Sequence, residues 1–136
     1  MPDFPFSTDI AVQLRDIDRL NHVNNAVVVT YLQQARIEYF DALLDYVDQD
    51  IDVVVATQTM EYMHPIEWGD TVAVDLRVTE IGSSSITVEY RVRVGDTVCA
   101  TAETVLVTFD REEQESVPLP DRWREALRAD NEAVLE

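Results

Sequence analysis

The stretch DIDRLNHVNN at residues 16–25, followed directly by AVVVTYLQQARIEYF at residues 26–40, is the part of the sequence that determines the fold. From Asn25 onward, apolar residues recur every three or four positions, which predicts one buried stripe along a helix. We expect this helix over about residues 25–46, with Asn24 as its N-cap, because an Asn side chain can accept a hydrogen bond from a free N–H group of the first turn. The residues of the stripe are Val28, Tyr31, Leu32, Ala35, Tyr39, Leu43 and Val47.

The sequence on both sides of this helix has the two-residue periodicity of β-strands. One strand is expected before the helix, at residues 8–16, and Pro118 and Pro120 precede a short amphipathic tail that predicts a C-terminal helix. The chain therefore reads as a single domain over residues 1–136, of class α+β, in which a five-stranded antiparallel sheet wraps a long central helix. The four strands after the helix are expected at residues 51–63, 72–78, 86–94 and 98–109.

The predicted sheet has one covered face and two open edges. A single helix covers only one face, and unpaired strand edges are usually protected by pairing with a second chain. We therefore expect a homodimer or a homotetramer.

The charge balance is extreme, with 27 acidic residues against 10 basic ones and a formal net charge of −17. Every basic residue is Arg, and the chain contains no Lys. Such self-repulsion destabilises a compact chain at low ionic strength, whereas 1 M salt shortens the Debye length to about 3 Å. We expect a salt-adapted, haloarchaeal-like protein, with an ordinary acidic surface as the alternative. The same charge argues against a nucleic-acid partner, which requires a basic face.

The sequence also indicates the cellular compartment in which the protein works. It contains neither a basic, apolar leader at its start nor a run of about 20 apolar residues, so we expect no membrane association. The single Cys99 lies in an apolar strand-like run, where a free thiol usually fills space in the core. These features predict a cytoplasmic protein.

Polar and titratable residues are concentrated directly before the helix, where they form a candidate site: Asp16, Asp18, Asn21, His22, Asn24 and Asn25. The free N–H groups and the positive end of the dipole at a helix start can polarise a thioester carbonyl or stabilise an oxyanion. A carboxylate beside them can act as a base or a nucleophile. Alternatively, the Asn and Asp residues serve only as turn and cap residues, and the His makes a structural hydrogen bond.

A resemblance follows from these residues. Asp18, HVNN at residues 22–25 and the helix VVVTYLQQARIEYF at residues 27–40 resemble the 4-hydroxybenzoyl-CoA thioesterase family of hotdog proteins. The similarity continues through Gly69-Asp70, the turn at Gly82, GDTVCATAETVLVTFD at residues 95–110 and PLP at residues 118–120. It implies a hotdog fold and the hydrolysis of an acyl-coenzyme A thioester to the free acid and CoA. No cofactor is implied, because CoA is part of the substrate.

The resemblance also implies roles for individual residues. Asp18 becomes the general base or the nucleophile, and backbone N–H groups at the helix start become the oxyanion hole. The residues that carry these N–H groups, and so bind the substrate, are Val23, Asn24 and Asn25.

A related group, the plant acyl carrier thioesterases, adds two candidates. These enzymes also contain HVNN and use its His, which makes His22 a second catalytic candidate. They carry Asn where this chain has Leu20, so their complete catalytic set does not transfer. Glu61, in an EY pair that matches their later carboxylate, is a weaker candidate, with an ordinary strand residue as the alternative.

The phosphates of CoA need basic partners, and the sequence contains no Gly-rich phosphate loop. Arg91 and Arg93 share the polar face of one predicted strand and Arg111 follows another, so these are weak candidates for phosphate contacts. Exposed salt bridges explain them equally well. The two His residues lack Cys or carboxylate ligands at metal-site spacing, so no metal is expected.

Two other functions stay open beside the thioesterase: a non-catalytic acyl-thioester-binding module, and an enoyl-thioester hydratase, although the predicted helix contains no His. The sequence does not encode the identity or length of the acyl group. It also leaves open whether the thioester is carried by CoA or by an acyl carrier protein, and whether Asp18 acts as base or nucleophile.

Overall fold

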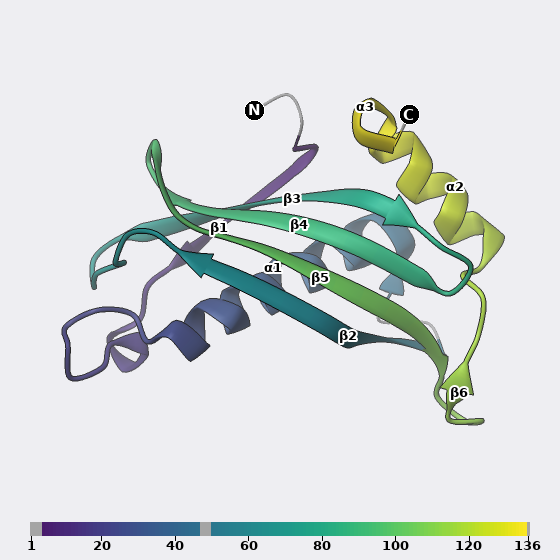
Figure 1. Cartoon of the computed structure of the whole chain (residues 1–136), viewed down its shortest axis with the longest axis horizontal. Helices are drawn as coiled ribbons and strands as arrows, with labels where there is room; N and C mark the ends of the chain where they lie inside the picture. Colours follow the sequence, from purple (N-terminus) through teal and green to yellow (C-terminus); the bar gives the residue numbers. More distant parts are fainter. Residues whose placement is uncertain (1–3, 47–49, 136) are drawn as a thin grey trace.

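The computed structural model describes residues 4–46 and 50–135. Within them the expected order of one strand, one long helix and four long strands is confirmed, and Figure 1 shows α1 crossing one face of the sheet. Val47, assigned to the helical stripe, lies outside the described residues. The elements are β1 (Phe6–Ala11), a 3-10 helix (Leu14–Asp16), α1 (Asn25–Leu44), β2 (Ile51–Tyr62), β3 (Thr71–Ile81), β4 (Ser85–Val94), β5 (Thr97–Asp110), β6 (Glu115–Ser116), α2 (Asp121–Asp130) and α3 (Glu132–Leu135).

The sheet has the strand order β1-β3-β4-β5-β2, and all of these neighbours are antiparallel. This confirms the five-stranded antiparallel sheet of the hotdog fold. The two-residue β6, which pairs with the end of β5, was not predicted. Strand β2 lies at one edge of the sheet, and eleven of its twelve residues pair with β5 on one side only, with a register shift at Ala56.

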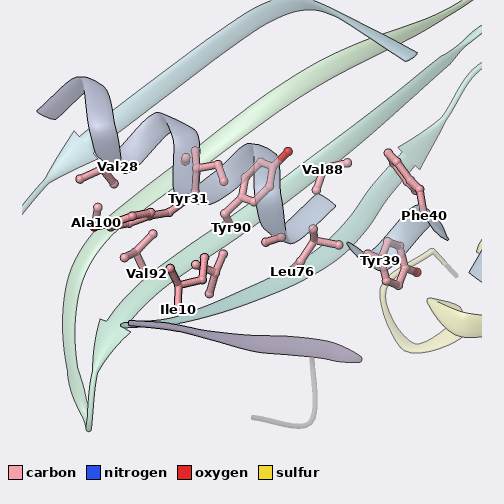
Figure 2. Close-up of a cluster of buried hydrophobic side chains, with 14 of the residues drawn as sticks. Ile10, Val28, Tyr31, Tyr39, Phe40, Leu76, Val88, Tyr90, Val92 and Ala100 are labelled. Carbon is pink, nitrogen blue, oxygen red and sulfur yellow. The ribbon is translucent and has the colours of Figure 1, made fainter. Parts of the chain in front are cut away.

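The core lies between α1 and the sheet. Val28, Tyr31 and Tyr39 of α1 are buried, and Figure 2 shows them facing buried side chains of the sheet, among them Leu76 and Tyr90. Burying apolar surface contributes about 25 cal/mol per Å², so this packing stabilises the domain.

Both ends of α1 have specific caps. The Asn24 side chain accepts a hydrogen bond from the Ala26 N–H at 2.9 Å, which confirms the predicted N-cap. At the other end, Asp45 has a φ of 52°, a left-handed conformation that stops the helix. The helix therefore ends at Leu44 and not at residue 46.

The first strand differs from the prediction of residues 8–16, because β1 ends at Ala11. The Val12 N–H donates to the Asp70 carbonyl at 3.2 Å, which continues the β1–β3 register by one residue beyond the last paired residues, Ala11 and Thr71. The Asp16 carboxylate then accepts the Gln13 N–H at 2.9 Å, which turns the chain into the 3-10 helix. Local side-chain bonding of this kind competes with strand formation.

No described helix is both long enough and apolar enough to cross a membrane.

Candidate active site

A tight loop places Asp18 and His22 directly before α1. Ile17 and Val23 form an isolated antiparallel bridge, and the Asp18 N–H donates to the His22 carbonyl at 3.0 Å. Asn21 has a φ of 64°, a left-handed conformation that Asn tolerates better than most residues. The two candidate side chains are therefore held on one short loop at the start of the helix.

The Asp18 carboxylate is fixed by two N–H donors. Its Oδ1 accepts the Leu20 N–H at 2.9 Å, and its Oδ2 accepts the Asn24 side-chain N–H at 3.2 Å. Since Asn24 also caps α1 through its other side-chain atom, one residue joins the carboxylate to the helix start. Each carboxylate oxygen has more than one acceptor position, so Asp18 can still receive a proton from a ligand or water.

The three N–H groups expected to bind an oxyanion have different partners. The Val23 N–H donates to the Ile66 carbonyl at 2.8 Å, and the Asn24 N–H donates to the Asp16 carbonyl at 3.0 Å. Among the described residues, the Asn25 N–H has no hydrogen-bond partner. Asn25 is the first residue of α1, so this N–H lies at the positive end of the helix dipole. It is the N–H group of the three that is open to a ligand.

A pocket of about 220 Å³ lies beside this helix start. Its walls come from the loop before α1, the first turns of α1, the end of β2 and the segment after it, and β5. The Tyr62 hydroxyl donates to the Asn25 carbonyl at 2.9 Å, and burial raises the pKa of Tyr62, so the hydroxyl stays a donor at neutral pH. The residues that bear on the chemistry are His22, Asn25, Tyr62, His64 and Cys99.

Tyr62 and His64 are not among the site residues that the sequence pattern predicts. They reach the pocket because the segment after β2 is bound at two points: Ile66 accepts the Val23 N–H, and Cys99 accepts the N–H groups of Met63 and His64. The only signal in the sequence was an aromatic residue at the end of the predicted strand 51–63 and a His directly after it.

Glu61 lies on the other face of the sheet. Side chains alternate along a strand, and Tyr62 points toward α1, so Glu61 points away from it. It lines a separate hollow together with Phe4, Arg91 and Thr101. The structure does not bring Glu61 to Asp18.

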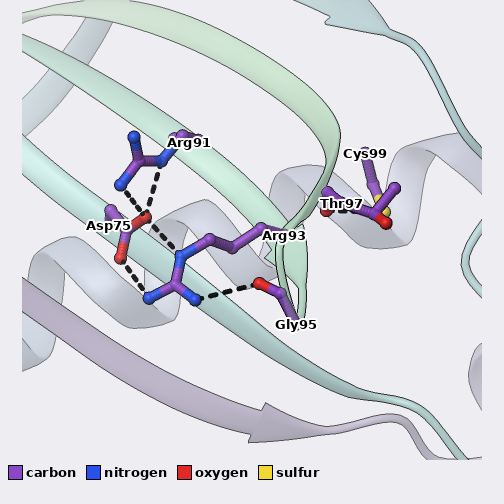
Figure 3. A network of polar contacts seen from close by, with 6 residues as sticks. All are labelled: Asp75, Arg91, Arg93, Gly95, Thr97 and Cys99. Atoms are coloured by element: carbon purple, nitrogen blue, oxygen red, sulfur yellow. Dashed lines mark hydrogen bonds and ion pairs between the residues drawn. The ribbon is translucent and has the colours of Figure 1, made fainter. Parts of the chain in front are cut away.

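Arg91 and Arg93 lie on the same outer face, where they share one carboxylate. Their Nε atoms both donate to Asp75 Oδ2 at 2.8 Å, as Figure 3 shows, and the Asp75 side chain is only 3% exposed. Burial alone would raise the pKa of Asp75, but the hydrogen bonds from Arg93, Ser7 and Arg91 outweigh it and hold the pKa below its usual value. Both arginines thus make the salt bridges that were the alternative to phosphate contacts.

Comparison with known proteins gives the family. Residues 12–127 match the Thioesterase-like superfamily. The chain belongs to this superfamily.

Two further similarities agree with membership of the thioesterase-like superfamily. A thioesterase from Thermus thermophilus, solved with coenzyme A and Zn, is 37% identical, with a TM-score of 0.87 over 97% of this chain and 98% of that one. The 1,4-dihydroxy-2-naphthoyl-CoA hydrolase of Synechococcus elongatus is 28% identical over 69 residues, about half (51%) of each chain.

A longer match is to a relative without an assigned activity. The uncharacterized protein YsmA of Bacillus subtilis is 26% identical over 91% of this chain and 86% of its own.

The Zn of the Thermus thermophilus thioesterase raises the question of a metal site in this member of the thioesterase-like superfamily. Within residues 4–46 and 50–135, no three or more His, Cys, Asp or Glu side chains cluster in a way that could hold a metal ion. The described donor set does not fit a resident metal, so no step of the chemistry is derived through one.

Cys99 is expected to be unreactive in the folded protein. It is 2% exposed, and burial raises the pKa of its thiol, so it stays protonated and inaccessible at neutral pH. A thiol reagent should label almost no protein in buffer and one thiol per chain in guanidinium chloride. Rapid labelling of the folded protein would contradict this and would show that the pocket wall opens.

Proposed function

We propose that this protein is a thioester hydrolase that converts an acyl-CoA to the free acid and CoA. The observation that carries the proposal is the link made by Asn24, which binds the Asp18 carboxylate and caps α1, the helix whose first residue, Asn25, lines a pocket with an unpartnered N–H; Asp18 itself is not among the residues that line this pocket. Membership of the thioesterase-like superfamily supports the same reaction class.

The proposed reaction uses the helix start for charge stabilisation. The thioester carbonyl oxygen accepts the Asn25 N–H, so the negative charge that develops on this oxygen lies at the positive end of α1. A thioester carbonyl is already electrophilic, which leaves a carboxylate and an oxyanion donor as the main requirements.

Asp18 then acts in one of two ways. As a general base it takes a proton from water, which attacks the carbonyl carbon while the C–S bond breaks. As a nucleophile it attacks the carbon itself and forms an anhydride, which water hydrolyses to regenerate the carboxylate. In both cases the CoA thiolate leaves and takes up a proton, for which His22 on the pocket wall is the candidate donor.

Release of free thiol from short, long and aromatic acyl-CoAs in molar KCl tests the proposal. We expect release from at least one class of substrate. Hydration of crotonyl-CoA without thiol release would instead indicate a hydratase. Tight binding of acyl-CoA without either reaction would indicate a binding module.

We further propose that the protein is a homo-oligomer that pairs through the edge strand β2. Residues 53–60 of this strand carry no charge in a chain with 27 acidic residues, and Val54 and Val55 are 46% and 41% exposed. An uncharged edge is where two strongly acidic copies repel each other least. Sedimentation equilibrium in molar KCl should give the mass of a dimer or a tetramer, and a monomer at micromolar concentration would contradict the proposal.

We also propose that the protein works in the cytoplasm of a salt-adapted cell, because of its net charge of −17 without any Lys. Molar KCl should raise its melting temperature markedly over that in low salt, because the salt screens the repulsion between carboxylates. Equal melting temperatures in the two conditions would show an ordinary acidic surface.

A further inference from the structure

The oxyanion hole proposed at the start of α1 has a single backbone donor. Among the described residues, the N–H groups of Val23 and Asn24 donate to carbonyl groups of the fold, and the Asn25 N–H is left for a ligand. Oxyanion holes generally aim more than one donor at the developing charge, and side chains such as His or Asn can supply the others. A second donor at this site would therefore be a side chain that lines the pocket.

The pocket beside Asn25 offers few side chains for this task. Tyr62 lines it, but the Tyr62 hydroxyl already donates to the Asn25 carbonyl at 2.9 Å. The exposed Asn25 side chain belongs to the same residue as the open N–H, so it would approach an oxyanion from the same side. The remaining side-chain N–H donors on the pocket wall are the imidazole rings of His22 and His64.

Both histidines of the chain line this pocket, although one precedes α1 and the other follows β2. In the part of the chain that the structure describes, neither imidazole ring has a hydrogen-bond or ion-pair partner. The described part of the pocket wall also contains no Asp or Glu, in a chain with 27 acidic residues. Both rings are therefore free to donate to a bound substrate.

His64 is the histidine whose wall is bonded directly to Asn25. The His64 N–H donates to the Cys99 carbonyl at 3.2 Å, which fixes its backbone against β5. Tyr62, two residues earlier, is bonded to Asn25 through its hydroxyl. Figure 1 shows the end of β2 and the start of α1 at the same end of the sheet. His64 therefore approaches the pocket from a different segment than the open N–H does.

His22 is placed differently, on the same loop as Asp18. Its carbonyl accepts the Asp18 N–H at 3.0 Å, so the two side chains start from neighbouring points of one loop. This position suits a proton transfer that accompanies the action of the carboxylate. The two histidines thus suit different tasks.

We propose that His64 is a second oxyanion donor, and that its imidazole N–H and the Asn25 N–H together bind the oxygen of the thioester. A neutral imidazole carries one N–H and an imidazolium carries two, so the ring can donate in either state. The inference rests on the proposed function, because it concerns the oxygen of the same thioester. No bond to His64 forms or breaks, since the ring only stabilises the charge that develops on the oxygen.

The kinetic test compares His64→Leu with His64→Gln, whose side-chain N–H can replace that of the ring. His64→Leu should lower kcat about a hundredfold, the usual effect of removing one oxyanion donor. Its KM should change less than about threefold, because the donor acts mainly on charge that is absent from the ground state. His64→Gln should recover most of kcat. The melting temperatures of both variants are measured in parallel.

The binding test uses two unreactive analogues of the acyl-CoA hydrolysed fastest, or of benzoyl-CoA if none is hydrolysed. In one, CH2 replaces the thioester sulfur, and in the other CF2 does. The CF2 ketone is hydrated in water and mimics the tetrahedral oxyanion. His64→Leu should reduce the preference for the CF2 analogue over the CH2 analogue by about the factor lost in kcat. His22→Leu, the same change at the other histidine, should keep the preference of wild type.

The inference and the proposed function fail separately. Wild-type kcat and an unchanged analogue preference in His64→Leu would overturn the inference alone. Equal losses in His64→Leu and His64→Gln, or equal losses of affinity for both analogues, would overturn it in favour of a structural role. Loss of the preference in His22→Leu but not in His64→Leu would make His22 the donor. No thiol release by folded wild type would overturn the proposed function, while the analogue preference would still decide the inference without turnover.

Discussion

Asp18→Asn is expected to lower kcat about a thousandfold, because the amide can neither take a proton from water nor attack the thioester. The substitution keeps the size of the side chain and the acceptor for the Leu20 N–H, although it replaces one acceptor facing Asn24 with a donor. The measurement is steady-state thiol release by the variant at saturating acyl-CoA, with acyl-CoA binding and the melting temperature measured in parallel. Full activity of the variant across all substrates would show that this carboxylate is not catalytic.

Asp16→Asn is the matched control, because it makes the same change two residues away. Asp16 accepts the Tyr31 hydroxyl at 2.7 Å and the Gln13 N–H at 2.9 Å, so its carboxylate is used by the fold. We expect a loss of about 1 to 2 kcal/mol in the free energy of unfolding, with kcat within a few-fold of wild type. If both variants lost kcat equally, the role of Asp18 would be to hold the loop.

The second large effect is expected on stability. Asp75→Ala should lower the free energy of unfolding by about 3 kcal/mol, because it leaves Arg91 and Arg93 beside a nearly buried position without their acceptor. This value is at the lower end for a buried ion pair, since the side chain of Arg93 is 32% exposed. Urea unfolding in constant KCl measures the change.

The control for this second variant removes an exposed pair. Arg111 and Asp52 are 2.9 Å apart, but their side chains are 52% and 45% exposed, so Arg111→Gln should unfold as wild type does. Similar losses from Asp75→Ala and Arg111→Gln would mean that the burial of Asp75 does not determine its contribution.

Acid unfolding of the same variants tests the shifted pKa. The pKa of Asp75 is lower in the folded protein than in the unfolded chain, so its contribution is complete above the unfolded value of about 4. The contribution is lost as the pH falls through the lower folded value. Wild type should therefore lose more stability than Asp75→Asn between about pH 4 and pH 2. Parallel stability curves over that range would contradict the assignment.

The long elements were predictable because their signals are local. Periods of 3.6 and 2 residues need only neighbouring positions, so α1 and the four strands after it were placed to within a few residues. The end of β1 was missed because the loose alternation continues to residue 16, whereas the Asp16 carboxylate accepts the Gln13 N–H and turns the chain into a 3-10 helix.

The site was predictable to the extent that it is built within one segment. Asn24 as N-cap follows from residue type alone, and the structure confirms it. The Asn25 N–H is the open one of the three because the Val23 N–H donates to Ile66 and the Asn24 N–H donates to Asp16. The periodicity of the sequence does not predict either bond. Whether Glu61 or Tyr62 faces α1 depends on which alternate residues of β2 point toward the helix, and Tyr62 does. A shift of one residue along the strand would exchange the two faces.

Most of the groups proposed to break the thioester bond come from a different segment of the chain than the residues that an acyl group would contact. Apart from His64, the groups proposed for bond breaking are contained within eight consecutive residues, Asp18 to Asn25, and this segment is tied to the pocket wall by the Tyr62 hydroxyl and by the Ile66 carbonyl. The wall that an acyl group would contact comes mainly from Tyr62 to Ile66 and from Cys99 and Ala100. Mutations of wall side chains that make no bond to the Asp18–Asn25 segment, such as those of Met63 and Ala100, can therefore change which acyl groups are accepted while the chemistry stays intact, which gives such a small domain a simple route to new substrates in evolution.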